Sequence, residues 1–129
     1  MVEYNECRED KALKELRPEL YIIDEGSKTE IETFQNETLR PILKLQHNLL
    51  MDFIQAQPNF DAVQKYKDKR VVFFERIRIY LQQPLLKGIL LGMILGYLTS
   101  DELQIFNQNS KEYKKRIHQM LIQRFSDSL

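Results

Sequence analysis

Residues 84–98, PLLKGILLGMILGYL, form the most apolar run of the chain and constrain its fold more than any other stretch. A helix that crosses a membrane needs about 20 apolar residues, and the uncharged run between Lys87 and Asp101 is shorter than that. A helix with almost no polar face must be buried on all sides, by its own chain or by a partner. The run therefore predicts a central helix inside the fold and argues against a membrane partner.

Three glycines in this run, Gly88, Gly92 and Gly96, stand four residues apart and fall on one narrow strip of a helix. Each glycine inside a helix costs about 1 kcal/mol relative to alanine. Close approach of another backbone is the usual gain that offsets this penalty, so the glycines are candidate packing or interface residues. The sequence favours packing within the chain. It leaves open a self-associating face, or a ligand that lies against the bare backbone.

The composition predicts an all-α fold. A sandwich or barrel needs many tight turns, and the chain of 129 residues has only four glycines and four prolines. This length suits one domain. We predict a single domain over 1–129, a bundle of five to seven helices around the glycine-bearing helix. The single cysteine, Cys7, cannot form an internal disulfide, which indicates a reducing, cytoplasmic location.

Acidic and basic residues number 19 each, so the formal net charge is zero. A neutral chain has no general attraction to nucleic acid or to anionic membranes. The charge is unevenly placed, because acids outnumber bases in residues 1–34 and bases outnumber acids in the rest. We expect residues 1–28 to form a partly ordered acidic arm that docks on the basic remainder of its own chain or of a partner.

A long helix is predicted over about 29–57. Thr29 and Glu32 have the spacing of a capping box, and apolar residues continue from there at three-to-four spacing. Pro41 lies inside this pattern, where proline removes a donor and clashes with the preceding turn. We expect either a kinked helix or two helices that meet near residues 39–40, and the unbroken phase of the apolar stripe favours the kink.

Residues 71–82 fit two patterns. Their β-branched and aromatic side chains suit a strand, yet their apolar residues also fit helical spacing. No second strand of similar strength lies nearby in the sequence, so we predict a helix. Further on, Thr99 with Glu102 and Asn109 with Glu112 have the spacing of two more capping boxes, which open the last two helices.

A polar edge of the kinked helix is the candidate ligand site. Asn36, Arg40, Lys44 and His47 follow one another in steps of three and four residues. An arginine at a kink, beside a lysine and a histidine, could hold a carboxylate or a phosphate. A plain solvated face explains the same residues more simply.

Signatures of metal and nucleophilic sites are missing from the sequence. The two histidines, His47 and His118, lie far apart, and HxxxH, HExxH and CxxC do not occur. No serine stands in a GxSxG context, and phosphate loops are absent. We therefore expect no metal, no cofactor and no catalytic residue. The basic segment KEYKKRIHQ reads as a solvated helix face, which argues against nucleic acid as a partner.

Two segments, FQNETLRPILKLQHNLL (34–50) and GILLGMILGYLTSDELQIFNQNSKEYKKRI (88–117), resemble a family of short all-helical bacterial proteins of unknown function. The resemblance covers about two-thirds of the chain and implies a helical fold. Members of that family are sometimes labelled glyoxalase. The sequence does not support that label, because we find neither the βαβββ modules nor the His and Glu metal ligands that common glyoxalases need.

Together these patterns predict a non-enzymatic helical module for interaction or assembly, which forms a homodimer. One alternative is a binder of a small anion, or an enzyme, that uses the polar site near Pro41. A weaker alternative is a regulator that acts through nucleic acid.

Overall fold

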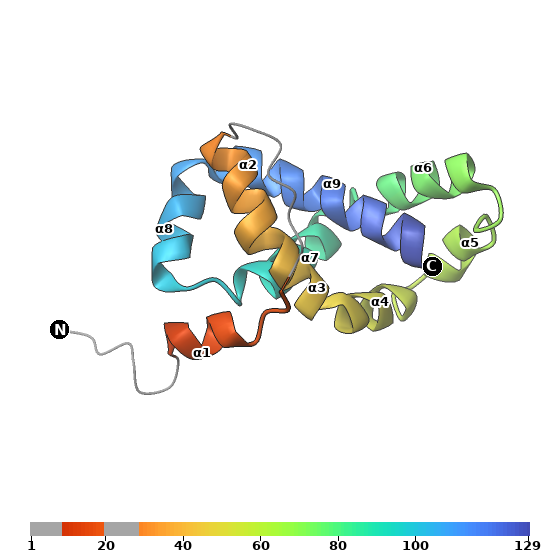
Figure 1. Ribbon diagram of the computed structural model, residues 1–129. Helices are drawn as coiled ribbons and strands as arrows, with labels where there is room; N and C mark the ends of the chain where they lie inside the picture. Colours follow the sequence, from red (N-terminus) through yellow and green to blue (C-terminus); the bar gives the residue numbers. More distant parts are fainter. Residues whose placement is uncertain (1–8, 20–28) are drawn as a thin grey trace.

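The computed structural model describes residues 9–19 and 29–129, and these residues are helical, with no strand among them (Figure 1). This confirms the prediction of an all-α bundle. The predicted acidic arm, residues 1–28, lies largely outside the described residues. The helices are, in order, α1 (Asp10–Glu15), α2 (Glu30–Phe34), the π-helix η1 (Gln35–Leu39), α3 (Arg40–Leu45), α4 (His47–Gln55), α5 (Phe60–Gln64), α6 (Arg70–Tyr80), α7 (Pro84–Leu95), α8 (Ser100–Gln108) and α9 (Ser110–Ser128).

The predicted kinked helix is a continuous run from α2 through η1 into α3, followed by α4. Thr29 caps it, since its hydroxyl accepts a hydrogen bond from the Glu32 N–H at 3.1 Å. The π turn of η1 ends at Leu39, two residues before Pro41. A π turn is a recognised cause of helix kinks, and here it comes where the proline removes an N–H donor. A second break falls at Gln46, whose side chain donates to the Met93 carbonyl of α7 at 3.0 Å.

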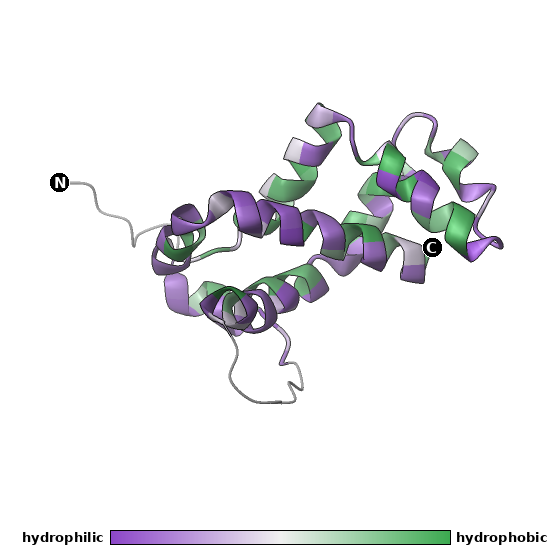
Figure 2. Ribbon diagram, turned by 90° about the horizontal axis from the view of Figure 1, so that it is seen from above, coloured by the Kyte–Doolittle hydropathy of each residue, from purple (hydrophilic) through white to green (hydrophobic). Residues whose placement is uncertain are grey.

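The long helix α9 extends across the molecule and packs against α6, α7, α8 and η1 (Figure 1). Its buried stripe is formed by Tyr113, Ile117, Leu121 and Phe125, which are spaced four residues apart. In Figure 2 hydrophilic and hydrophobic residues alternate along most helices, as expected of amphipathic helices with one face in the core.

The segment with two possible readings, residues 71–82, is helical and forms α6 and its C-terminal turn. Phe73, Ile77 and Leu81 are buried at a spacing of four, whereas Val71 and Ile79 are 85% and 54% exposed. The prediction of a helix is therefore confirmed.

The predicted burial of the glycine-bearing helix on all sides is not provided by the described residues of its own chain alone. Leu86, Leu90 and Ile94 of α7 are buried at a spacing of four, and the partly buried Leu91, Met93 and Leu95 also pack against the core. Leu85 on the other side is 78% exposed. Burial of one stripe is enough to hold a helix in a bundle, so the apolar character of the opposite side has another reason.

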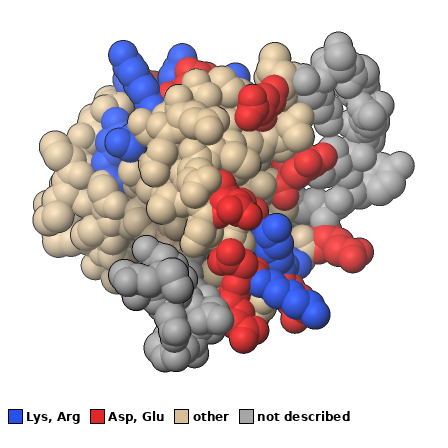
Figure 3. Space-filling model, turned by 90° about the vertical axis from the view of Figure 1, so that its left-hand side faces the viewer, with Lys and Arg blue, Asp and Glu red and all other residues tan. Residues whose placement is uncertain are grey.

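The described N-terminal segment is held to the body just after α1 by an ion pair in which the segment supplies the base and the body supplies the acid, the reverse of the expected arrangement. Arg17 donates two hydrogen bonds to the Glu102 carboxylate, at 2.6 and 2.7 Å, and one to the Tyr97 carbonyl at 3.0 Å. Thr99 and Glu102 form the predicted capping box at the start of α8. Figure 3 shows the face that carries α1 and α8, where acidic and basic side chains are interspersed.

The capping box predicted at Asn109 is wrong. The Asn109 side chain makes no cap hydrogen bond, because its backbone (φ −140°, ψ 44°) is not in the extended conformation of a helix cap. Glu112 instead accepts a hydrogen bond from Arg116 at 2.9 Å. No described helix has the combination of length and hydropathy that crossing a membrane requires.

Candidate functional site

Three features of the described surface are candidates for binding a ligand or a partner. The first is the outward side of α7, formed by Leu85, Gly88, Ile89 and Gly92, which we call the glycine strip. The second is a groove between α3 and α9, and the third is an apolar pocket between α7 and α9.

The glycine strip faces away from the core. A Cβ atom built on Gly88 or on Gly92 would meet no atom of a neighbouring element within 4 Å. Leu85 and Ile89, next to them on the helix surface, are 78% and 41% exposed. Packing within the chain, the role that the sequence favoured, therefore does not explain these two glycines among the described residues. These two glycines therefore either contact a molecule outside the described chain or face the solvent.

Gly96 differs from the other two glycines. It is the C-cap residue of α7, with ordinary helical backbone angles (φ −60°, ψ −18°). A Cβ atom there would lie 3.1 Å from the Gly92 carbonyl oxygen, within the last turn of its own helix. We therefore leave Gly96 out of the glycine strip.

The predicted polar site near Pro41 is partly assembled. Arg40 and Lys44 line a groove of about 430 Å³ together with Arg124 of α9. His47 joins them indirectly, because its Nδ1 lies 3.1 Å from Nη1 of Arg124. Asn36 does not line the groove. Sequence spacing could not reveal Arg124, since it comes from a helix far along the chain.

The electrostatics of this groove favour an anion. Burial, and then the positive charge of Arg40, lower the pKa of Arg124. Asp127 also lines the groove, but its carboxylate already accepts a hydrogen bond from Gln123 at 2.9 Å. The groove has both apolar and charged lining residues, and the cations among them suit an anion.

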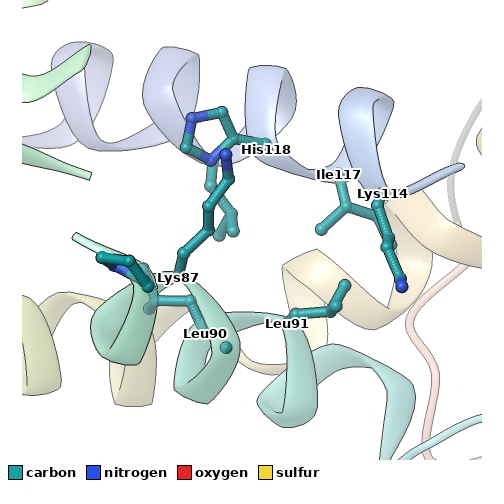
Figure 4. A pocket seen from close by; sticks show the side chains of 9 residues that line it. Lys87, Leu90, Leu91, Lys114, Ile117 and His118 are labelled. Carbon is teal, nitrogen blue, oxygen red and sulfur yellow. The ribbon is translucent and has the colours of Figure 1, made fainter. Parts of the chain in front are cut away.

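The third feature is a pocket of about 270 Å³ between α7 and α9 (Figure 4). Its walls are mainly apolar and include Leu90, Leu91 and Ile117. Three nitrogen-bearing side chains, Lys87, Lys114 and His118, also line it. No spacing rule within one helix selects these three residues. The only sequence signal for Lys114 and His118 was the basic character of the last helix, which is equally typical of a solvated face, and Lys87 of α7 had no signal.

His118 is held in an unusual environment for an imidazole. Its Nε2 atom is buried and has no hydrogen-bond partner among the described residues. Burial, followed by the nearby charge of Lys87, lowers the pKa of His118 below 6.5. The ring is therefore neutral at neutral pH, with one polar nitrogen left to serve a ligand.

Within the part of the chain that the structure describes, no group of three His, Cys, Asp or Glu side chains is placed to hold a metal ion. Comparison with known proteins does not indicate a function for this chain. No family model, no curated protein and no solved structure matches this chain. The resemblance to a family of helical proteins thus stays a prediction, and the function must be argued from the three features themselves.

Proposed function

We propose that the chain is a non-enzymatic assembly module, in which the glycine strip of one copy packs against the glycine strip of a second copy. The observation that carries this proposal is the exposure of Gly88 and Gly92 between the exposed side chains of Leu85 and Ile89. Two glycines on the outside of a helix weaken it by about 1 kcal/mol each. A neighbouring helix that uses the bare backbone would offset that loss.

The shape of the glycine strip supports a second copy as the occupant. Leu85 and Ile89 are projections spaced four residues apart, and Gly88 and Gly92 are hollows with the same spacing. A surface that alternates projections and hollows with one period can fit a copy of itself across a two-fold axis. Small residues also let two helix backbones approach closely, with weak Cα–H···O contacts between them.

The apolar composition of the glycine strip also supports a second copy of the chain as the partner. None of its four residues is charged or polar, so two strips can meet without burying an unpaired charge. The nearest charge, Lys87, reaches toward His118 instead (Figure 4). Burial of apolar surface contributes about 25 cal/mol per Å², and a symmetric dimer is the commonest closed assembly.

A matched pair of variants tests this proposal. Leu85→Lys places a charge in the glycine strip, whereas Leu103→Lys places the same charge at another exposed leucine, on α8. We expect Leu85→Lys to have the monomer mass of 15.5 kDa and Leu103→Lys to keep the dimer mass, twice that value. Light scattering measures both masses. The proposal fails if the two variants have the same mass.

The groove between α3 and α9 supports a second candidate function, the binding of a small phosphate or carboxylate anion. Arg40, Lys44 and Arg124 converge there from two helices. Arginine pairs well with such anions because its guanidinium binds two oxygens at once. We expect inorganic phosphate or citrate to raise the thermal midpoint of the native chain and to lose that effect in Arg124→Gln. Equal midpoint shifts in the two proteins would remove this candidate.

We further propose that the module works in the cytoplasm, because its single cysteine fits a reducing compartment. Nucleic acid is not among the partners we propose, since the formal net charge is zero and the basic residues of α9 alternate with buried apolar ones.

A further inference from the structure

The pocket between α7 and α9 has the construction of a site for a small amphipathic molecule. The buried stripe of α7 and that of α9 form its floor, and Leu91 and Ile117 approach each other from opposite walls (Figure 4). Its volume of about 270 Å³ is roughly nine times the volume that one water molecule takes in the liquid. The pocket can therefore hold about nine or ten non-hydrogen atoms.

The polar groups of the pocket are all nitrogen-bearing. Lys87 extends from α7 toward the ring of His118, and Lys114 points into the gap from α9 at the other end (Figure 4). Neither lysine has an ion-pair partner among the described residues. The buried Nε2 of His118 is without a hydrogen-bond partner there as well. The two lysines are exposed to solvent, and together with the unused imidazole nitrogen they give an apolar pocket the donors that an anionic group can use.

We propose that this pocket binds a small carboxylic acid with an apolar body, in the class of medium-chain fatty acids. The apolar body lies between Leu90, Leu91 and Ile117, and the carboxylate accepts hydrogen bonds from Lys87 and from the His118 ring. A carboxylate needs only a few donors, which this site supplies. A phosphate has no apolar body, so it would leave the apolar walls without a partner and would lie against them as a charged group.

The imidazole ring of His118 should give a spectroscopic signal of ligand binding in the pocket. The charged groups that line the pocket with it are Lys87 of α7 and Lys114 of α9, both positive, and Lys87 adds to the effect of burial in lowering the pKa of His118. A carboxylate beside the ring has the opposite effect and raises that pKa. Binding at this site should thus move the imidazole resonances of His118 in a proton–nitrogen correlation spectrum.

The probe is octanoate, which has about ten non-hydrogen atoms, and its matched control is 1-octanol, which has the same tail without the charge. We expect saturable binding of octanoate with a shift of the His118 resonances, and binding of 1-octanol weaker by at least about tenfold, the usual effect of losing hydrogen bonds to a charged group. Equal affinities, or binding that leaves the His118 resonances unmoved, would overturn the proposal.

Matched variants locate the site. Lys87→Gln should weaken octanoate binding by at least about tenfold, whereas Lys111→Gln, at an exposed lysine of α9 outside the pocket, should leave it within about twofold. Arg40→Gln should also leave it unchanged, because Arg40 lines the other groove. Weakening by Arg40→Gln, or equal effects of the two lysine variants, would overturn the proposal.

The pocket is formed by one chain, so its occupancy does not depend on the proposed dimer. Gly88 belongs to the glycine strip and also lines the pocket, and for that reason the titration is repeated on Leu85→Lys. We expect the octanoate affinity of this variant to stay within about twofold of the unmodified protein. Loss of binding in a folded Leu85→Lys variant would contradict a pocket built from α7 and α9 of a single chain.

Discussion

The substitution Gly92→Ala should strengthen the fold of a single chain. The added methyl group meets no neighbouring element within 4 Å, so it creates no clash. Alanine in place of glycine inside a helix stabilises the helix by about 1 kcal/mol. In a domain of this size, such a gain raises the midpoint of thermal unfolding by about 4 °C.

The same methyl group should weaken the dimer. If two glycine strips meet, Gly92 of each copy lies where the backbones approach, and both copies carry the extra methyl group. Overpacking of a close contact costs at least about 1 kcal/mol per methyl group. About 2 kcal/mol in total corresponds to a dissociation constant roughly thirty-fold higher. One substitution is thus expected to act in opposite directions on folding and on association.

Two measurements separate these effects. Thermal unfolding is followed by circular dichroism at a concentration where the chain is monomeric, since a dimer would make the midpoint depend on concentration. Sedimentation equilibrium gives the dissociation constant. Ala62→Gly, at an exposed position of α5, is the control that should lower the midpoint and leave association unchanged. A lower monomer midpoint in Gly92→Ala, or an unchanged dissociation constant, would contradict these opposite effects on folding and on association.

Three further predictions concern the fold. Leu90→Ala should lower the free energy of unfolding by about 3 kcal/mol, because Leu90 is 1% exposed. Leu85→Ala should change the free energy of unfolding of the monomer by less than about 0.5 kcal/mol. Similar losses for the two variants in urea unfolding would contradict the orientation of α7. Thr99→Ala should cost about 1 kcal/mol through the lost cap, and an unchanged urea midpoint would count against the capping box. Burial opposes ionisation of Glu102, but hydrogen bonds from Arg17 and Thr99 outweigh it and hold the pKa of Glu102 below 4.5. The stability that the charge of Glu102 provides is therefore present above about pH 4.5 and is lost as the pH falls through the folded-state pKa. Unfolding free energies of the native chain and of Glu102→Gln should accordingly converge in acid, and a constant difference would exclude this linkage.

Features of the fold that depend only on residues close together in the chain could be predicted from the sequence. The cap at Thr99 and the irregular helix around Pro41 both follow from interactions within about one turn of the chain. The orientation of α7 could not be predicted in this way. Its residues are apolar or glycine on every side except Lys87, so the pattern contains no polar face that would indicate which side meets the solvent.

Contacts between different helices could not be predicted from the sequence for a related reason. Lys87 and His118 come from different helices and meet only because α7 packs on α9. Arg124 likewise reaches the groove of Arg40 from α9. A spacing rule within one helix finds residues on one face, and for this reason it selected Arg40 and Lys44 but could not select their partner. It also selected Asn36, which does not line the groove.

The central claim is that two copies of the chain associate through the glycine strip. The most direct measurement is the mass of the unmodified chain by light scattering, over a concentration range from about 1 to 100 µM. We predict about 31 kDa at the upper end, which is twice the chain mass of 15.5 kDa. A mass of 15.5 kDa at every concentration would contradict the proposal.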